Sequence, residues 1–228
     1  MSLEKRLFNW FKPFGPYIVK TTISNEMYET LLDATNKIRK NKKLRKEYDW
    51  RNKLAGNIKE EYAVDKILST DDYKKVLQEL IWMAKYYFDR GGEAHNQNDN
   101  VNVSLQDIRV QGPPWVNIMK SGEWNPNHIH KSHLSCVAFI KIPKEIEQEN
   151  KKSDSSNKSN MPSAGRLQFL YGEDIDFCRT GLVIEPKEKD IYFFPARLKH
   201  AVYPFKSNVE RMSMSCNFYS DKYESLKF

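Results

Sequence analysis

Histidines are crowded into one short stretch of this chain. Three of its five histidines, His128, His130 and His133, lie within six consecutive positions of SGEWNPNHIHKSHLS. A neutral imidazole is a common nitrogen ligand for transition metals, whereas a single histidine on a strand is more often a surface or hydrogen-bonded core residue. The crowding therefore raises the question of a metal site.

A metal site needs a further ligand from elsewhere in the chain, and His200 in FFPARLKHAVYPF is the candidate. Side chains at i and i+2 of a strand point to the same face, so His128 and His130 would form one half of the site. His133 has an odd offset from this pair and would face the other way if the strand continues. The sequence predicts that His128, His130 and His200 hold one metal ion and leave positions open opposite them.

Length and composition set the frame for such a site. A chain of 228 residues with 39% hydrophobic and 13% aromatic residues can bury one substantial core. We therefore expect a single domain over residues 1–228. The net charge of +7 comes largely from scattered lysines, which predicts mild attraction to polyanions and no defined nucleic-acid footprint.

The cysteines and the apolar runs indicate the cellular compartment of the protein. Cys136, Cys178 and Cys216 are odd in number and far apart, and they contain no C-x-x-C pair. We expect them to be reduced, buried thiols in a cytoplasmic protein. The apolar runs are shorter than a membrane span, so neither secretion nor a membrane anchor is expected.

Two helices are predicted in the amino-terminal part, residues 1–100. SNEMYETLLDATNKIRK begins with Ser24 as a capping residue, and its apolar residues recur on one helix face. TDDYKKVLQELIWMAKYYFDR begins at Thr70 with acidic residues near its positive end. We expect DRGGEAHNQNDN to end the second helix, because paired glycines and an Asn/Asp cluster favour turns.

The hydrophobic pattern changes at about Val101, where short runs rich in β-branched and aromatic residues begin. Eight such runs are separated by Gly, Pro and Asn, from VNVSLQDIRV to RMSMSCNFYS. They predict a mainly β sandwich or barrel over 101–228, with the two helices packed on one sheet. The polar insertion at 144–164 has little to bury, and we expect a flexible loop there.

Several segments of the chain carry a family resemblance. They are LAGNIKEEY at 54–62, Trp115 and Asn117, His128 and His130, Leu134 to Phe139, Gly165 to Phe169, Phe194 to Pro204, and Arg211 to Asn217. These pieces resemble the Fe(II)/2-oxoglutarate-dependent oxygenases, whose fold is a double-stranded β-helix (jelly roll), and in particular a group common in bacteria and phages. LAGNIKEEY fits the amino-terminal part of that group.

The resemblance implies a dioxygenase that uses Fe(II), 2-oxoglutarate and O2 and that hydroxylates a C–H bond of an unidentified primary substrate. In this scheme Arg211 pairs with the distal carboxylate of 2-oxoglutarate, because a guanidinium fork matches a carboxylate. Ser213 lies two residues along the same strand face and would add a hydroxyl donor. Further candidates to line the cosubstrate pocket are Asn117, Tyr171, Tyr192 and Asn217.

The chain departs from the usual oxygenase triad at one position. His130 stands where that triad has a carboxylate, and a third neutral ligand leaves the metal site more positive. His133, Glu173, Asp174 or Asp176 could be recruited instead of His130, and the sequence leaves this open.

The same spacing also resembles the cupins. GEWNPNHIH fits the first cupin motif, but its later glutamate is absent and Arg197 replaces the glycine of the second motif. The alternatives are therefore a cupin-like metal-binding module with zinc or nickel and no turnover, or a cupin enzyme that does not use 2-oxoglutarate. Only the oxygenase interpretation requires Arg211 to be a buried cation facing the open metal positions.

Fold and cosubstrate do not specify the primary substrate. The sequence shows no evident base-stacking groove, which favours a peptide side chain or a small molecule over a nucleic acid. Pairing of exposed β edges would allow a homodimer.

Overall fold

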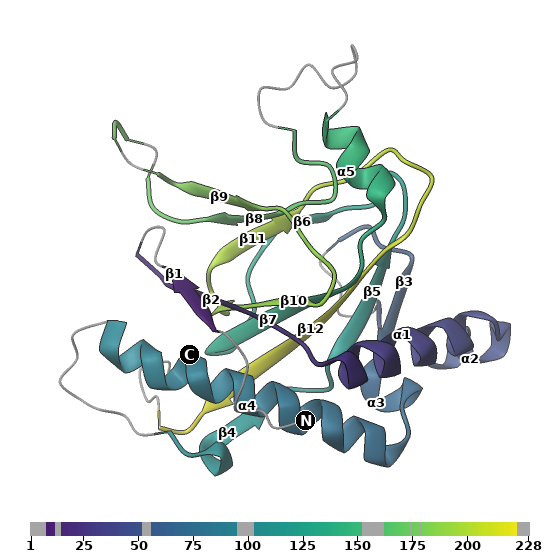
Figure 1. Ribbon diagram of the computed structural model, residues 1–228, viewed down its shortest axis with the longest axis horizontal. Coiled ribbons are helices and arrows are strands. Elements are labelled where there is room, and N and C mark those ends of the chain that lie inside the picture. The colour runs from purple at the N-terminus through teal and green to yellow at the C-terminus, as the bar shows by residue number, and fades with distance from the viewer. Residues whose placement is uncertain are drawn as a thin grey trace.

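The strands of the molecule form two sheets that face each other (Figure 1). The computed structural model describes residues 8–11, 15–51, 56–94, 103–151, 162–173, 175–177 and 179–222. The larger sheet has the order β1-β2-β10-β7-β12-β5-β3, with β4 also paired to β12, and the smaller has the order β6-β11-β8-β9. The larger sheet contains β1 (Asn9–Phe11), β2 (Ile18–Thr22), β3 (Glu60–Ala63), β4 (Ile108–Val110), β5 (Trp115–Met119), β7 (Leu134–Lys141), β10 (Asp190–Pro195) and β12 (Arg211–Ser220). The smaller sheet contains β6 (Asn125–His128), β8 (Leu167–Leu170), β9 (Gly181–Ile184) and β11 (Lys199–Val202).

The path of the chain identifies the fold. From β5 to β12 the chain passes between the sheets, with β5, β7, β10 and β12 in the larger and β6, β8, β9 and β11 in the smaller. Strands wound in this way form a double-stranded β-helix, or jelly roll. The predicted fold class is confirmed.

Helices α1 (Asn25–Arg39) and α4 (Thr70–Ala94) cover the outer face of the larger sheet (Figure 1). The helical elements are α1 (Asn25–Arg39), α2 (Lys42–Glu47), α3 (Val64–Ile67), α4 (Thr70–Ala94), η3 (Leu105–Asp107) and α5 (Lys144–Lys151). The predicted start of α1 is correct, because the Ser24 side chain accepts a hydrogen bond from the backbone N–H of Met27 at 3.0 Å. Such a cap satisfies one of the free N–H groups of the first helix turn.

The two faces of the larger sheet differ in character: one packs on the helices and the other faces the space between the sheets. In β12 the side chains of Met212, Met214, Cys216 and Phe218 join the core under α1 and α4. The alternate residues, Arg211 among them, face the space between the sheets. Burying one large apolar side chain contributes about 1.5–3 kcal/mol, so the helices hold β12 in one register and thereby fix its polar face.

The amino-terminal part is not only helical as predicted. It also supplies β1, β2 and β3, and the last two extend the larger sheet on both sides of the jelly roll. β2 pairs with β10, and β3 pairs with β5. The β-branched run IVKTT of β2 is short and lies beside a stronger helical pattern, so its pairing depends on β10, which is distant in the sequence.

Two predicted boundaries are also corrected. Helix α4 continues through the glycine pair to Ala94, because glycine weakens a helix without removing its hydrogen bonds. The insertion at 144–164 was expected to be a flexible loop, but it begins as helix α5, whose Ile146 is buried. Asn150 ties this helix to Ala164 by hydrogen bonds of 3.0 and 2.8 Å. Residues 152–161 of the insertion lie outside the described residues.

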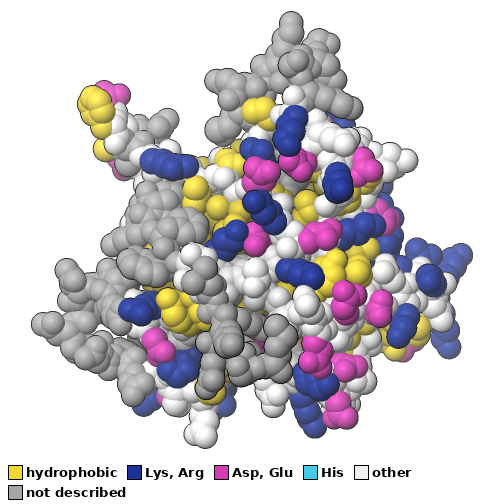
Figure 2. All heavy atoms as spheres, viewed as in Figure 1, with side chains coloured by type: hydrophobic (Ala, Val, Ile, Leu, Met, Phe, Trp, Pro, Cys, Tyr) yellow, Lys and Arg dark blue, Asp and Glu magenta, His cyan; other side chains and the backbone are white. Residues whose placement is uncertain are grey.

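Other expectations can be placed on the structure. Cys136 and Cys216 are buried free thiols, whereas Cys178 lies outside the described residues. Lysine, arginine and acidic side chains are interspersed on the face seen in Figure 2. None of the described helices is both long and apolar enough to cross a membrane.

Candidate functional site

The smaller sheet brings two distant histidines together. β6 and β11 pair antiparallel with His128 directly opposite His200, and their ring centroids are 4.2 Å apart. His200 is buried, with 5% of its surface exposed, and His128 is half-buried. Strand pairing, which joins positions 72 residues apart in the sequence, therefore builds the first half of the site.

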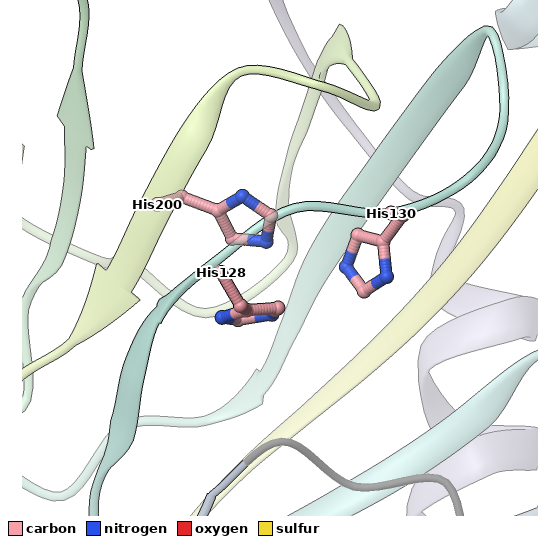
Figure 3. A group of neighbouring side chains, drawn as sticks. All are labelled: His128, His130 and His200. Carbon is pink, nitrogen blue, oxygen red and sulfur yellow. The ribbon is translucent and has the colours of Figure 1, made fainter.

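The third imidazole, that of His130, is placed by a loop and not by the continuous strand that was predicted. β6 ends at His128, so His130 is not the i+2 residue of a continuous strand. Its backbone N–H instead donates to the carbonyl of Ala196 at 2.8 Å, and its ring meets the edge of Trp115. The ring centroid of His130 lies 5.1 Å from those of both His128 and His200, and Figure 3 shows the three rings converging.

The three imidazoles are suitable metal ligands. One ring nitrogen from each of His128, His130 and His200 lies within 4.8 Å of the others. Two nitrogens bound to one ion at about 2.1 Å can be up to about 4.2 Å apart. A small side-chain movement is therefore enough to close the three around one ion.

Hydrogen bonds select the ligating nitrogen in two of these rings. Nδ1 of His128 is 2.7 Å from the carbonyl oxygen of Pro126, and Nδ1 of His200 is 2.8 Å from that of Leu198. A carbonyl can only accept, so each Nδ1 carries the proton and each Nε2 keeps its lone pair. Bonds of this kind orient ligating histidines in metal proteins.

Burial keeps these rings neutral. It lowers the pKa of His200 to about 3, with additional effects from the charges of His128 and His130. Burial also lowers the pKa of His130 to about 4 and the pKa of His128 below its usual range. A neutral imidazole is the form that binds a metal ion, so the site is ready for a metal at neutral pH.

The same pKa shifts predict an acid-sensitive metal-free protein. Below the ordinary histidine pKa of about 6.5 these three histidines bind protons in the unfolded chain but remain neutral in the folded chain. Stability is therefore complete above about pH 6.5 and falls on acidification towards about pH 4, where His130 begins to protonate in the folded state. We expect a loss of several kcal/mol, measured as a falling Tm of metal-free protein. The loss should be smaller in His200→Gln, and an equal slope in both proteins would contradict the prediction.

The alternative third ligands do not join this cluster. His133 follows the bend after His130, and its Nδ1 accepts from the backbone N–H of Ser220 at 3.1 Å. Glu173 and Asp176 are exposed, and Asp174 lies outside the described residues. In the described part of the chain, the histidine cluster is the one group of His, Cys, Asp and Glu that could hold a metal ion.

Arg211 is a buried cation with no counter-ion among the described residues. Only 1% of its surface is exposed, and its Nη1 donates to Ser213 Oγ at 3.2 Å. Its Nε and Nη2 find no hydrogen-bond partner in that part of the chain. Burial lowers its pKa to about 10, so it is still charged at neutral pH. A buried charge in this state is costly unless an anion joins it.

A cavity of about 330 Å³ connects Arg211 with the histidine cluster, and this volume is in the range of ligand sites. Phe194 and Leu167 form part of its apolar wall. Gln111 and Ile129 also line it and are exposed, so they mark its mouth.

Some of the other residues predicted to contact the cosubstrate line the cavity, and some do not. Asn117 is buried and lies directly opposite Ser213 in the register of β5 and β12. Asn217 lines the cavity six residues along β12 from Arg211, roughly 20 Å away. A five-carbon keto acid held by Arg211 does not reach it, so the predicted contact of Asn217 does not fit this geometry. Tyr171, which is half-exposed, and Tyr192 are not among the lining residues.

Sequence reasoning missed Glu61, which also lines the cavity. It lies on β3 opposite Asn117, and only 2% of its surface is exposed. Its neighbour Glu60 points the other way and accepts from Arg39 at 3.0 Å and from Lys120. Adjacent residues of a strand face opposite sides of the sheet. If EEYA at 60–63 had been recognised as a strand, the sequence would have placed Glu60 and Glu61 on opposite faces and one of the two carboxyl groups inside.

Comparisons with known proteins agree with this architecture. Residues 114–217 match the model of a family described as "Putative 2OG-Fe(II) oxygenase". No curated protein matches the chain. The chain is similar to the solved structure of the non-heme alpha ketoglutarate dependent epimerase SnoN from nogalamycin biosynthesis, with 13% identity and a TM-score of 0.55 over 91% of this chain and 80% of that one. It is also similar to AviO1 from Streptomyces viridochromogenes Tue57, with 11% identity and a TM-score of 0.55 over 90% of each chain. At these identities the likeness to solved structures shows the fold.

Proposed function

We propose that the protein is a non-haem Fe(II)- and 2-oxoglutarate-dependent dioxygenase, and the match of residues 114–217 to a model of 2OG-Fe(II) oxygenases supports this proposal. Its primary substrate would be a peptide side chain or a small molecule that is hydroxylated at a C–H bond. The observation that carries the proposal is the fully buried guanidinium of Arg211, which has no ion-pair partner among the described residues and lies in the cavity that the three histidines line.

The charge of Arg211 defines what the cavity should bind. Two of its nitrogens lack partners, and a carboxylate can accept two parallel N–H bonds from one guanidinium. The keto acid 2-oxoglutarate has such a carboxylate at one end and a chelating keto-carboxylate at the other. Its distal end would neutralise Arg211 while its keto end turns towards the histidines.

Each residue then has a defined task. His128, His130 and His200 would hold Fe(II), and the carbonyls of Pro126 and Leu198 fix two of those rings. When bound, Fe(II) supplies the O2 chemistry in which 2-oxoglutarate is converted to succinate and CO2 and the primary substrate is oxidised.

Second contacts and walls complete the site. Ser213 can turn its hydroxyl to the distal carboxylate, because it already touches Arg211. The Arg211 guanidinium carbon lies over the ring of Phe139, 5.2 Å from the ring centroid. Apolar walls exclude water there and strengthen the ion pair.

The cupin-like alternatives make no use of Arg211. A metal module, or a cupin enzyme that binds its substrate directly to the metal, needs the histidines alone. Either protein would keep a buried cation at a cost in stability without return. This is the physical ground for preferring the oxygenase.

The proposal is tested by anaerobic titration of the Fe(II)-loaded protein with 2-oxoglutarate. We expect the weak visible charge-transfer band of a chelated keto acid, saturating at one equivalent. Succinate is the matched control, because it can reach Arg211 but lacks the keto group and should give no band. Iron bound at one equivalent without a band would overturn the proposal and favour the cupin-like protein.

A further inference from the structure

The cavity contains two buried ionisable side chains that do not meet, one basic and one acidic. Arg211 is one of them and Glu61 is the other. Among the described residues, neither side chain makes an ion pair. The first is assigned to the cosubstrate above, and the second has no role in that scheme.

Strand register keeps the two ionisable side chains apart. Glu61, Asn117 and Ser213 occupy one row across β3, β5 and β12, and Arg211 lies one row further along opposite Met119. Two strand spacings separate β3 from β12, which is roughly 10 Å. A ligand at Arg211 and a second ligand at Glu61 can therefore occupy the cavity together.

Asn117 holds the Glu61 carboxyl group in place. In the amide orientation that satisfies both groups, Asn117 Nδ2 donates to Glu61 Oε2 at 2.5 Å, and Asn117 Oδ1 accepts from Trp115 Nε1 at 3.3 Å. Trp115 in turn meets the His130 ring edge-on. Glu61 is thus positioned by the same residues that surround the metal ligands.

The surroundings of Glu61 suit a cation. Trp50 and Trp115 line the same cavity, and indole faces attract cations. Of the nearby charges, Asp49 and Arg51 pair with each other. Lys131 also lines the cavity but is exposed to solvent. Glu61 also borders a second pocket with Lys42, Arg45, Lys46 and Lys59, but no described basic residue makes an ion pair with it.

Building on the proposed function, we propose that Glu61 is the recognition site for a cationic group of the primary substrate. The substrate class is then an amine or a guanidine, such as a lysine or arginine side chain or a small polyamine-like molecule. Its ammonium or guanidinium group would pair with Glu61 and thereby present a neighbouring C–H bond to the metal side of the cavity. Glu61 would select and position the substrate and would not take part in the oxidation.

The protonation of Glu61 supports this assignment and gives it a pH signature. Burial raises its pKa to about 8, with an additional rise from Asp49 that Arg51 opposes. Only the ionised form attracts a cation. The affinity for a permanently charged guanidinium should therefore rise about tenfold from about pH 7 to about pH 9.

The test is calorimetric titration of the anaerobic Fe(II)- and 2-oxoglutarate-loaded protein with n-butylguanidinium. The matched neutral probe is n-butylurea, which has the same shape. We expect the wild type to prefer the guanidinium by about tenfold or more, and Glu61→Gln to lose that preference. Asp176→Asn, at an exposed carboxylate outside the lining of the cavity, is the control for general surface charge and should keep the preference.

The outcomes separate this inference from the proposed function. A normal keto-acid band without any preference between the two probes would overturn the role of Glu61 and leave the oxygenase intact. A Glu61→Gln protein that loses Fe(II) or 2-oxoglutarate instead would also overturn it, because the carboxylate would then belong to the metal centre. Absence of the band in the wild type would overturn the proposed function itself. Thermal unfolding of Glu61→Gln verifies that the variant is folded.

Discussion

Arg211→Met is expected to remove most of the 2-oxoglutarate affinity and, at the same time, to stabilise the ligand-free protein. Losing one partner of a buried ion pair costs about 2–5 kcal/mol, or roughly 30- to 3000-fold in Kd. In the ligand-free state, however, methionine replaces a buried cation that lacks a counter-ion. The variant should therefore unfold at a temperature a few degrees higher, since about 1 kcal/mol shifts Tm by roughly 2–4 °C at this size.

The two readouts together make this prediction specific. Kd is measured from the keto-acid band and Tm from thermal unfolding without ligand. Arg211→Lys keeps the charge but loses the fork, so it should lie between the wild type and Arg211→Met in affinity. Arg109→Ala removes an exposed arginine and should change neither quantity. A large fall in Tm for Arg211→Met, with unchanged 2-oxoglutarate binding, would mean that Arg211 serves the fold alone.

Single replacement of His128, His130 or His200 by alanine is expected to weaken Fe(II) binding by at least about 100-fold. Loss of an outer-shell partner already costs about 10- to 100-fold in metal affinity, and a ligand contributes more. Kd for Fe(II) is measured by competition with a chelator under anaerobic conditions. His133→Ala is the matched control and should bind iron normally, because that ring bonds to the backbone of Ser220.

His130 is the informative position in that series. If His130→Ala binds iron as tightly as the wild type, the site has two histidine ligands and the third ligand comes from elsewhere. His130→Asp restores the carboxylate that is usual in the resembling oxygenases, and we expect it to keep iron. It would also lower the positive charge at the metal, because an anion replaces a neutral ring.

The stability and affinity predictions share a physical cause. A site for a dianionic cosubstrate must keep a cation out of water before that ligand arrives, and the free protein bears the cost. Strain of this kind is typical of functional sites, where stabilising replacements reduce activity. In this chain the cost of the buried cation arises at Arg211, the first residue of β12. The apolar residues that alternate with it hold the strand in place.

Local patterns in the sequence determined much of the fold and part of the site. The cap at Ser24 and the apolar face of each long helix predicted α1 and α4. The strand-like run RMSMSCNFYS placed Arg211 and Ser213 on one face of β12. The histidines were recognised from residue type and spacing, and Arg211 from the resemblance to the 2-oxoglutarate-dependent oxygenases. Each of these signals lies within a few neighbouring residues, because helix and strand periods are local properties of the backbone.

Only the tertiary structure decided how distant segments meet. The pairing of β6 with β11 sets His128 opposite His200, and a loop tied to Ala196 brings in His130 where a continuous strand was predicted. The place of β3 beside β5 turns Glu61 into the cavity and Glu60 away from it. Register between strands depends on long-range packing, and a shift of one residue exchanges the two faces. For that reason the sequence by itself determined which residues could do chemistry, and the fold decided which of them share one cavity.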